Sequence, residues 1–161
     1  MKKKVALFDI DGTIFRSSLL IELVEALITE KIFPVQSRSL YTREYRAWQN
    51  RRGSYEAYIE AVIATFMKYL KGVSYADFER VGKAVVETHQ DQVYCYTRDL
   101  AKKLKSRGYF LLAISQSPKG ILDAFCKRLG FNKVYGRFYE LGPSDKFTGV
   151  VTDLHLIANK A

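Results

Sequence analysis

The sequence predicts an α/β domain that carries an all-helical insertion directly after its first strand. Three observations favour this architecture. The apolar run from Val5 to Phe8 has the composition of a strand and ends in acidic residues. The next run with strand composition begins only at Tyr109, and the segment between the two has helical periodicity throughout.

The first element is a strand over residues 4–8, whose unbroken apolar character is typical of a strand buried on both faces. About four helices follow, and each has a candidate N-cap serine: Ser17, Ser39, Ser54 and Ser74. The segment from Ser74 to Asp77 resembles a capping box in which the shorter aspartate replaces glutamate.

Helices and strands alternate after the insertion. The predicted elements are a helix with Thr97 as its N-cap, a strand over 109–114, a helix with Ser117 as N-cap and Pro118 as first residue, a strand over 133–135, and a β-hairpin of 138–141 with 147–151. The expected division is a core of residues 1–16 and 94–161 and a helical cap of residues 17–93.

Composition narrows the class of protein. No apolar run is long enough to span a membrane, and Cys95 and Cys126 give neither a disulfide framework nor a metal-binding spacing, which favours the cytoplasm. The formal net charge is +9, and residues 96–161 carry 12 Lys and Arg against 5 Asp and Glu. Such a surplus fits nucleic acid, an anionic small substrate or solvated helix faces, and solvated faces are the usual explanation.

Two carboxylates stand close together where the first strand ends. Asp9 and Asp11 are two residues apart, so in an extended chain both side chains point to the same side. Ligands of open α/β sheets bind at the carboxyl ends of strands. A divalent cation such as Mg²⁺ would offset the repulsion between the carboxylates. Gly12 permits a tight turn, and Thr13 can hold the turn by hydrogen bonds. The alternative is a pair of turn-stabilising aspartates without chemistry.

These residues carry a resemblance to a known family. The run FDIDGT resembles the first motif of the haloacid dehalogenase superfamily of phosphohydrolases, and LLAIS, which ends in Ser115, is similar to its second motif. A helical cap directly after the first motif resembles the phosphoserine-phosphatase-like branch. Lys160, 45 residues after Ser115, stands where the family's third motif has a lysine. The resemblance implies a Rossmann-like core with a parallel sheet.

The resemblance also implies roles for single residues. Asp9 would be the nucleophile and a Mg²⁺ ligand, and Asp11 the general acid and base, with its backbone carbonyl also reaching the metal. The expected phosphate-binding residues are Gly12, Thr13, Ser115, Gln116 and Lys160. The implied reaction is hydrolysis of a small phosphorylated metabolite through an aspartyl-phosphate.

One family motif has no counterpart in the sequence. The fourth motif, an acidic pair after a further strand, is absent up to Ala161, since Asp145 falls in the predicted hairpin loop and Asp153 follows a hairpin strand. The sequence is therefore expected to be truncated at its C-terminal end, and the source of a third metal ligand stays open. An alternative function is a catalytically impaired remnant that binds phosphate or a protein.

The predicted cap is expected to set the choice of substrate. Its run from Tyr41 to Arg52 interleaves arginines with aromatic residues, which suits either nucleotide or RNA binding or an amphipathic helix with Trp48 inward. The amphipathic helix is favoured, so nucleic acid is disfavoured as a partner, and the oligomeric state stays open. Phosphoserine is disfavoured as substrate because Ser18 stands where the family places a glutamate, although Glu22 could substitute for it.

Overall fold

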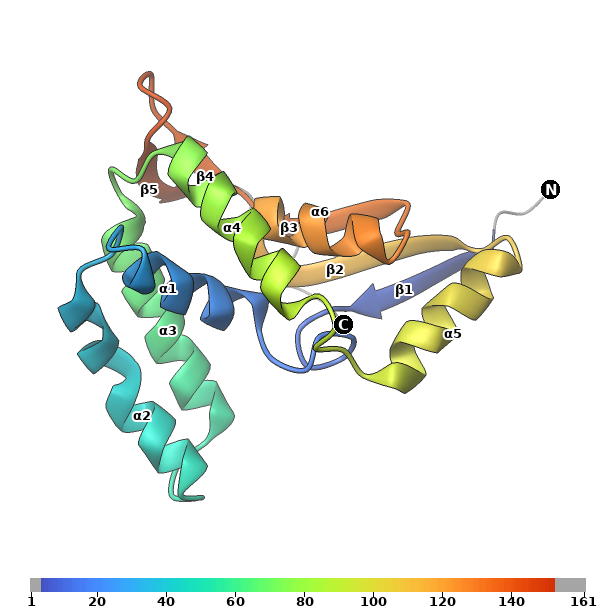
Figure 1. Cartoon of the computed structure of the whole chain (residues 1–161), viewed down its shortest axis with the longest axis horizontal. Helices are drawn as coiled ribbons and strands as arrows, with labels where there is room; N and C mark the ends of the chain where they lie inside the picture. The colour runs from blue at the N-terminus through green and yellow to red at the C-terminus, as the bar shows by residue number, and fades with distance from the viewer. Residues whose placement is uncertain (1–3, 153–161) are drawn as a thin grey trace.

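The computed structural model describes residues 4–152 and confirms the predicted α/β fold (Figure 1). Its central sheet has three parallel strands, β1 (Val5–Asp9), β2 (Phe110–Pro118) and β3 (Lys133–Arg137), in the order β1-β2-β3. The register runs from Val5 opposite Phe110 to Asp9 opposite Ile114. Because β1 and β2 run in the same direction, the residues that follow them meet at one edge of the sheet.

The predicted helical insertion lies between β1 and the rest of the sheet. It consists of α1 (Leu19–Thr29), the 3₁₀ helix η1 (Val35–Arg38), α2 (Ser39–Gln49), α3 (Tyr55–Leu70) and α4 (Tyr75–His89). Ser54 and Ser74 cap α3 and α4 as expected. The N-cap of α1 is Ser18 rather than Ser17, and α2 follows directly on η1 without a side-chain cap at its start.

The predicted capping box at the start of α4 forms with one difference. The backbone N–H of Asp77 donates to Ser74 Oγ over 3.1 Å, as the motif requires. The Asp77 carboxylate accepts from the Ser74 hydroxyl over 2.7 Å. The aspartate side chain is one carbon shorter than that of glutamate, so it reaches the nearer hydroxyl.

Two helix starts after the insertion differ from the prediction. Helix α5 (Cys95–Ser106) begins before Thr97, whose hydroxyl donates to the carbonyl of Thr13 over 2.7 Å and so binds the loop after β1. Helix α6 (Lys119–Arg128) begins after Pro118, because β2 continues far enough for Pro118 to pair with Arg137 of β3. Ser117 is therefore a strand residue and not an N-cap.

The expectation that the first strand is buried on both faces is wrong for two residues. Val5 and Leu7 remain 53% and 63% exposed, whereas Phe8 is buried. Within residues 4–152, β1 is one of the two edge strands of the sheet, and it pairs with β2. The unbroken apolar run therefore reflects a strand with one covered face in the described part of the chain.

The predicted hairpin forms from β4 (Tyr139–Leu141) and β5 (Phe147–Val151) and packs on the inserted helices (Figure 1). The N–H of Gly72 donates to the carbonyl of Phe147 over 2.8 Å, and the N–H of Phe147 donates to the carbonyl of Val73 over 3.0 Å. The Phe147 ring meets Phe78 of α4 edge-on, with centroids 5.0 Å apart. The hairpin thus ties the second half of the chain to the junction of α3 and α4.

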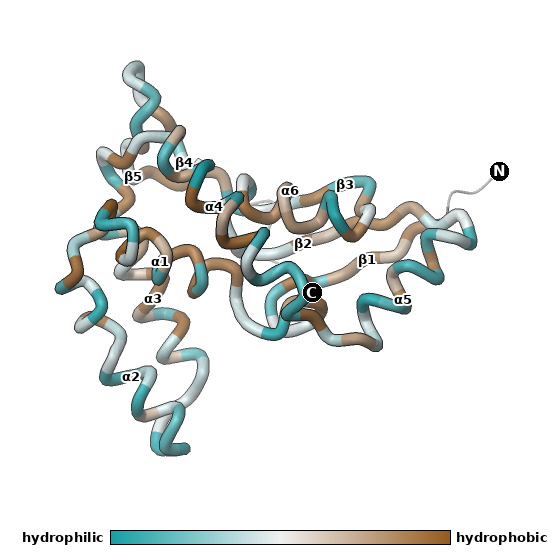
Figure 2. Tube along the Cα trace, viewed as in Figure 1, coloured by the Kyte–Doolittle hydropathy of each residue, from teal (hydrophilic) through white to brown (hydrophobic). Residues whose placement is uncertain are grey.

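A single apolar cluster runs through both parts of the protein. Helix α4 contacts α1 on one side and α6 on the other, so it joins the insertion to the sheet layer. Phe15, just after β1, meets Phe125 of α6 with centroids 5.4 Å apart. Figure 2 shows apolar stretches along α1 and the strands, and hydrophilic stretches along α2 and α5. None of the helices in the described residues is long and apolar enough to cross a membrane.

Candidate active site

The chain turns sharply after β1 and closes into a tight loop. Gly12 has φ +75°, a left-handed conformation that glycine adopts without steric cost. Its N–H donates to the carbonyls of Phe15 and Ser17 over 2.9 and 3.1 Å. The carbonyl of Ile10 accepts from three successive N–H groups, those of residues 13 to 15. This loop fixes the backbone on both sides of Asp11.

Asp11 is held by three donors from different parts of the chain. The backbone N–H of Leu19, the first residue of α1, donates to Oδ1 over 2.7 Å. The Ser117 hydroxyl donates to Oδ2 over 2.9 Å, and the Ser115 hydroxyl donates to the same oxygen. Burial raises the pKa of Asp11 above its ordinary value, and the lowering effect of these three hydrogen bonds does not cancel it. Burial therefore favours the protonated form of this carboxyl group.

Asp9 accepts a hydrogen bond from the loop that follows β1. The Thr13 hydroxyl donates to Asp9 Oδ2 over 3.1 Å, so Thr13 stabilises the loop as expected. Asp9 and Asp11 both line the same cavity, as their spacing predicts. Both carboxylates are therefore half-buried beside the end of β1 and face the same cavity.

The end of β2 contributes residues on both sides of Asp11. Gln116 and Ser117 line the cavity, and Gln116 Oε1 accepts from Arg137 Nη2 over 3.0 Å. Ser115 is buried beneath Asp11 and accepts from the N–H of Ser117 over 3.0 Å. The second expected motif is therefore adjacent to the first. Lys160 and Asp153 lie outside the described residues.

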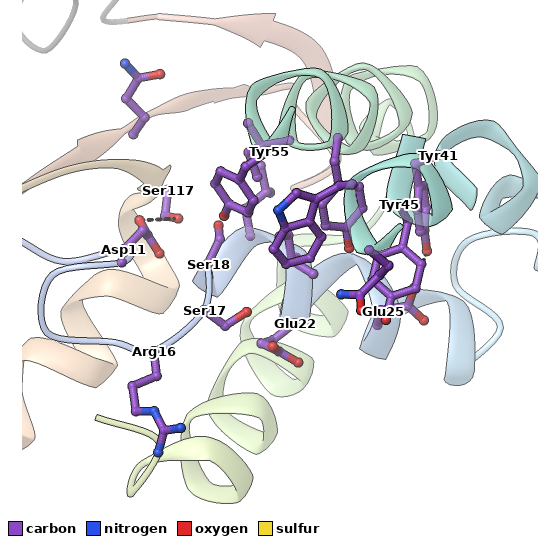
Figure 3. A pocket seen from close by; sticks show the side chains of 18 of the residues that line it. Asp11, Arg16, Ser17, Ser18, Glu22, Glu25, Tyr41, Tyr45, Tyr55 and Ser117 are labelled. Atoms are coloured by element: carbon purple, nitrogen blue, oxygen red, sulfur yellow. Dashed lines mark hydrogen bonds between the residues drawn. The ribbon is translucent and has the colours of Figure 1, made fainter. Parts of the chain in front are cut away.

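The cavity has a volume of about 1040 Å³ and extends from β1 and β2 to the inserted helices. In Figure 3, Asp11 and Ser117 lie at one end, and Tyr41 and Tyr45 lie at the other. Besides Asp9, Asp11, Gln116 and Ser117, its lining residues include Arg16, Ser17, Ser18, Glu22, Glu25, Arg38, Tyr41, Tyr45, Arg46, Trp48, Tyr55, Tyr58 and Tyr94. The insertion therefore covers the acidic end of β1 as a cap.

The arginine-rich run of the cap forms an amphipathic helix. Tyr41 of α2 is buried and Trp48 is half-buried against α3, while the Arg43 side chain is exposed and pairs with Glu44. Arg46 lines the cavity. The arrangement agrees with the interpretation of this run as an amphipathic helix.

Sequence reasoning missed two features of the site. It did not find Ser117 as a partner of Asp11, since it placed this residue at a helix start. It also missed the aromatic residues of α3. Tyr55 and Tyr58 are three residues apart and therefore share a helix face, which was the available signal.

The oxygen atoms of the site suit a hard cation. Mg²⁺ prefers oxygen ligands and usually takes one or two carboxylates in proteins. The carboxylate of Asp9 and the backbone carbonyl of Asp11 are the available donors. Among the described residues, no group of three or more His, Cys, Asp or Glu could hold a metal ion. The residues present fit a Mg²⁺ site whose other ligands would be water and phosphate.

The fold and the site together define an α/β protein with a cavity between the end of a parallel sheet and an inserted set of helices. The sequence pattern of the haloacid dehalogenase-like hydrolases matches residues 6–159, so the chain belongs to that family. This match confirms the resemblance inferred from FDIDGT and LLAIS. No curated protein sequence matches the chain.

Solved structures share the fold at low sequence identity. A protein of unknown function from Bordetella pertussis Tohama I is 12% identical with a TM-score of 0.69, and the match covers 95% of this chain and 68% of that one. A phosphoserine phosphohydrolase-like protein from Francisella tularensis is 12% identical with a TM-score of 0.60, covering 94% and 65%. Phosphoserine phosphatase from T. onnurineus is 22% identical with a TM-score of 0.53, covering 91% and 62%. The chain thus spans less than two thirds of the length of the last two.

Proposed function

We propose that the protein is a Mg²⁺-dependent phosphatase that hydrolyses a small phosphorylated metabolite through an aspartyl-phosphate. The observation that carries the proposal is the pair of carboxylates, Asp9 and Asp11, that line one capped cavity at the end of β1. Membership of the haloacid dehalogenase-like hydrolases supports it. The fold shared with phosphoserine phosphatase structures agrees with this chemistry.

Asp9 is the proposed nucleophile. Its carboxylate would attack phosphorus, the bond to the alcohol oxygen would break, and water would later release phosphate from the carboxylate. Asp9 is suited to this role because it lines the cavity at the end of β1. Thr13 orients the carboxylate through its hydrogen bond to Oδ2.

Asp11 is the proposed general acid and base. A general acid must carry a proton when substrate binds, and burial raises the pKa of Asp11 in that direction. The proton would pass to the leaving alcohol oxygen, and the resulting carboxylate would then take a proton from water. The donors from Leu19, Ser115 and Ser117 hold the side chain and stabilise its charged form in the second step.

The proposed metal site uses the Asp9 carboxylate and the backbone carbonyl of Asp11. When bound there, Mg²⁺ would neutralise charge on the phosphate and on Asp9. The proposed phosphate-binding groups are Gly12, Thr13, Ser115, Gln116 and Lys160. Ser117, which lines the cavity, is added to them.

The cap region bears on the choice of substrate. Ser18, the N-cap residue of α1, is buried. Its side chain has no carboxylate that could meet an amine of the substrate. Glu22 lines the cavity one turn further along α1 and could take that role. Phosphoserine therefore stays disfavoured as a substrate. The proposed cap comprises residues 17–93, and the proposed core comprises residues 1–16 and 94–161. These boundaries follow the change from consecutive helices to alternating helices and strands. The proposed location is the cytoplasm, which suits a small metabolic substrate.

The test is hydrolysis of p-nitrophenyl phosphate with and without Mg²⁺ by the protein and by its Asp9→Asn variant. Turnover that requires Mg²⁺ and is lost in Asp9→Asn is expected, and acid quenching during turnover with a ³²P-labelled ester should leave label on Asp9. Asp91→Asn, an exposed aspartate outside the cavity, is the matched control. Mg²⁺ and phosphate binding without any turnover would instead favour a phosphate-binding or protein-binding role.

A further inference from the structure

A second hollow lies where helix α6 meets strand β3, and it is here called the basic hollow. Its volume is about 540 Å³. Three lysines and three aromatic residues are among its lining residues: Lys119, Lys127, Lys133, Phe131, Tyr135 and Phe138. None of these six lines the cavity that contains Asp9 and Asp11. In Figure 1, α6 and β3 lie well apart from α2. The basic hollow is therefore separate from the proposed active site.

The basic hollow carries positive charge that carboxylates of the protein do not neutralise. Residues 119–138 contain five Lys and Arg against one Asp. Lys119 pairs with that aspartate, Asp123, one turn further along α6. Within residues 4–152, neither Lys127 nor Lys133 has a carboxylate within ion-pair distance, and both are exposed. Two lysines of the hollow are therefore available to an anionic ligand.

Stabilisation of the helices does not account for this charge. Lys127 belongs to the last turn of α6, where the helix dipole favours a cation. Lys119 is the first residue of the same helix, where the dipole disfavours a cation, and Lys133 belongs to a strand. Lys105 of α5 adds a further charge near the hollow, because its ammonium group donates to the carbonyl of Gly130, next to Phe131. Three different elements thus bring lysines to one place.

Aromatic rings alternate with the lysines in the basic hollow. Phe138 is 43% exposed, and Tyr135 is half-buried. The ammonium group of Lys133 lies 4.9 Å from the ring centroid of Tyr135, and that of Lys119 lies 5.9 Å from the ring centroid of Phe138. Aromatic rings that remain accessible in a concave site favour a ligand that covers them. The hollow therefore presents both cationic and flat apolar groups to a ligand.

We propose that the basic hollow binds single-stranded nucleic acid. One base would stack on the ring of Phe138 or Tyr135, and the neighbouring phosphates would lie at Lys127 and Lys133. Proteins that bind single strands combine a positively charged groove for the backbone with aromatic side chains on which bases stack. The inference goes beyond the phosphatase reaction and does not depend on it. Nucleic acid was disfavoured as a partner on the arginine-aromatic run of the cap, and the hollow contains no residue of that run.

The residues of the basic hollow favour a nucleic acid over other polyanions. An acidic peptide would match the charge of Lys127 and Lys133 but would bring no flat ring to Phe138 and Tyr135. An anionic membrane presents a broad surface of headgroups, which would not fill a hollow of about 540 Å³. A single strand carries phosphates and unpaired bases in alternation, as the hollow alternates lysines and rings.

The experiment measures binding of a fluorescently labelled single strand to the metal-free protein by anisotropy, so that it depends on neither metal nor turnover. The probe is a strand of about 12 thymidines. The comparison strand has the same length and charge, but its sugars carry no bases. The thymidine strand is expected to bind about tenfold more tightly than the abasic strand, because stacking of one base contributes about 1–3 kcal/mol. Equal binding of the two strands would overturn the proposal, because it would show attraction to any polyanion.

Competition distinguishes the other polyanions. Oligoglutamate and vesicles that contain phosphatidylglycerol are added at the same concentration of negative charge as unlabelled thymidine strand. The unlabelled strand is expected to displace the probe best. Equal or better displacement by oligoglutamate would overturn the proposal in favour of an acidic protein partner. Equal or better displacement by the vesicles would overturn it in favour of a membrane surface.

Aromatic variants locate the base. Phe138→Leu and Tyr135→Leu should each weaken binding of the thymidine strand by up to about tenfold and leave binding of the abasic strand unchanged. Leucine keeps an apolar side chain at these positions and removes the ring. Phe138→Leu changes an exposed residue and serves if Tyr135→Leu does not fold. The matched control is Tyr96→Leu, because Tyr96 is 78% exposed on α5, outside the hollow. Unchanged binding of the thymidine strand in Phe138→Leu and Tyr135→Leu would overturn the proposal.

Lysine variants locate the phosphates through the salt dependence of binding. The logarithm of the association constant falls with the logarithm of the salt concentration, with a slope of about 0.7 for each phosphate that a single strand places against a cation. Lys127→Gln together with Lys133→Gln should therefore reduce this slope by about 1.4. The matched control is Lys31→Gln together with Lys71→Gln, two exposed lysines outside the hollow. An unchanged slope in the first pair, or an equal reduction in the control pair, would overturn the proposal.

Discussion

The backbone N–H of Leu19 donates a hydrogen bond of 2.7 Å to the Oδ1 atom of Asp11. Leu19 is the first residue of α1, so the first free N–H group of the cap helix is satisfied by a side chain of the sheet end. The positive end of the helix dipole also favours the charged form of that carboxylate. This one contact therefore links the start of the first cap helix to the position of the proposed general acid.

Asp11→Asn should change the pH dependence of stability in the metal-free protein. Burial raises the pKa of Asp11 above the value of about 3.9 in the unfolded chain. A raised folded-state pKa contributes stability that is fully present below the unfolded pKa and is lost as pH rises through the folded pKa. Urea unfolding from pH 4 to pH 8 should therefore show the variant gaining stability relative to the original protein.

Asparagine suits this comparison because its amide can keep the contacts of the carboxylate. Its oxygen can accept from Leu19, and its NH₂ group can donate to the hydroxyls of Ser115 and Ser117, which rotate freely. Asp91→Asn, at an exposed position, should show no such trend. A relative loss of stability in Asp11→Asn as the pH rises would contradict the raised pKa.

The same substitution should affect turnover according to the leaving group. Without a general acid, esters of poorly acidic alcohols should lose the most activity, because their leaving oxygen needs a proton most. Asp11→Asn should therefore reduce hydrolysis of β-glycerol phosphate by about 10²-fold or more, and that of p-nitrophenyl phosphate much less. Equal losses on both esters, measured as kcat/KM, would argue against an acid role for Asp11.

The Ser117 hydroxyl should stabilise the site mainly through Asp11. It donates to Asp11 Oδ2 over 2.9 Å, and a hydrogen bond within a protein contributes about 1 kcal/mol to stability. Ser117→Ala should lower the free energy of unfolding at pH 7 by about that amount. The loss should shrink to about 0.5 kcal/mol or less in an Asp11→Ala background, as a double-mutant cycle would measure. An undiminished loss would mean that Ser117 acts through other contacts.

The sequence predicted the parts of this protein that local patterns determine. Ser54 and Ser74 cap their helices as expected, and the β-hairpin forms around its predicted turn, because caps and turns depend on a few neighbouring residues. Asp9 and Asp11 were found because strand geometry fixes the direction of side chains two residues apart. The tight turn at Gly12 was predicted because glycine adopts a positive φ without steric cost.

The sequence did not predict features that depend on distant contacts. Thr97 is a good N-cap by type, but its hydroxyl binds the carbonyl of Thr13, which lies 84 residues away. Ser117 stays in β2 because Pro118 next to it pairs with β3. The exposure of Val5 and Leu7 depends on which strands flank β1, and the apolar run carries no information on that.

Gly136 of β3 provides a test of how the sheet supports the site. A Cβ atom there would lie 3.0 Å from both the carbonyl oxygen of Ser117 and the Cα of Lys119, and 2.6 Å from Leu122 Cδ1. Two of these atoms belong to the backbone and cannot turn aside, so Gly136→Ala must separate β3 from the end of β2. Overpacking of this kind costs about 1–3 kcal/mol.

Gly136→Ala should therefore lower the free energy of unfolding by about 1–3 kcal/mol and also weaken phosphate binding, because Ser117 moves with its carbonyl. Gly142→Ala in the hairpin is the matched control, since a Cβ there would meet its nearest atoms at an ordinary 3.6 Å. Urea unfolding gives the stability of both variants, and calorimetry with Mg²⁺ and phosphate gives the binding. If Gly136→Ala is destabilised while phosphate binding is unchanged, the end of β2 does not take part in the site.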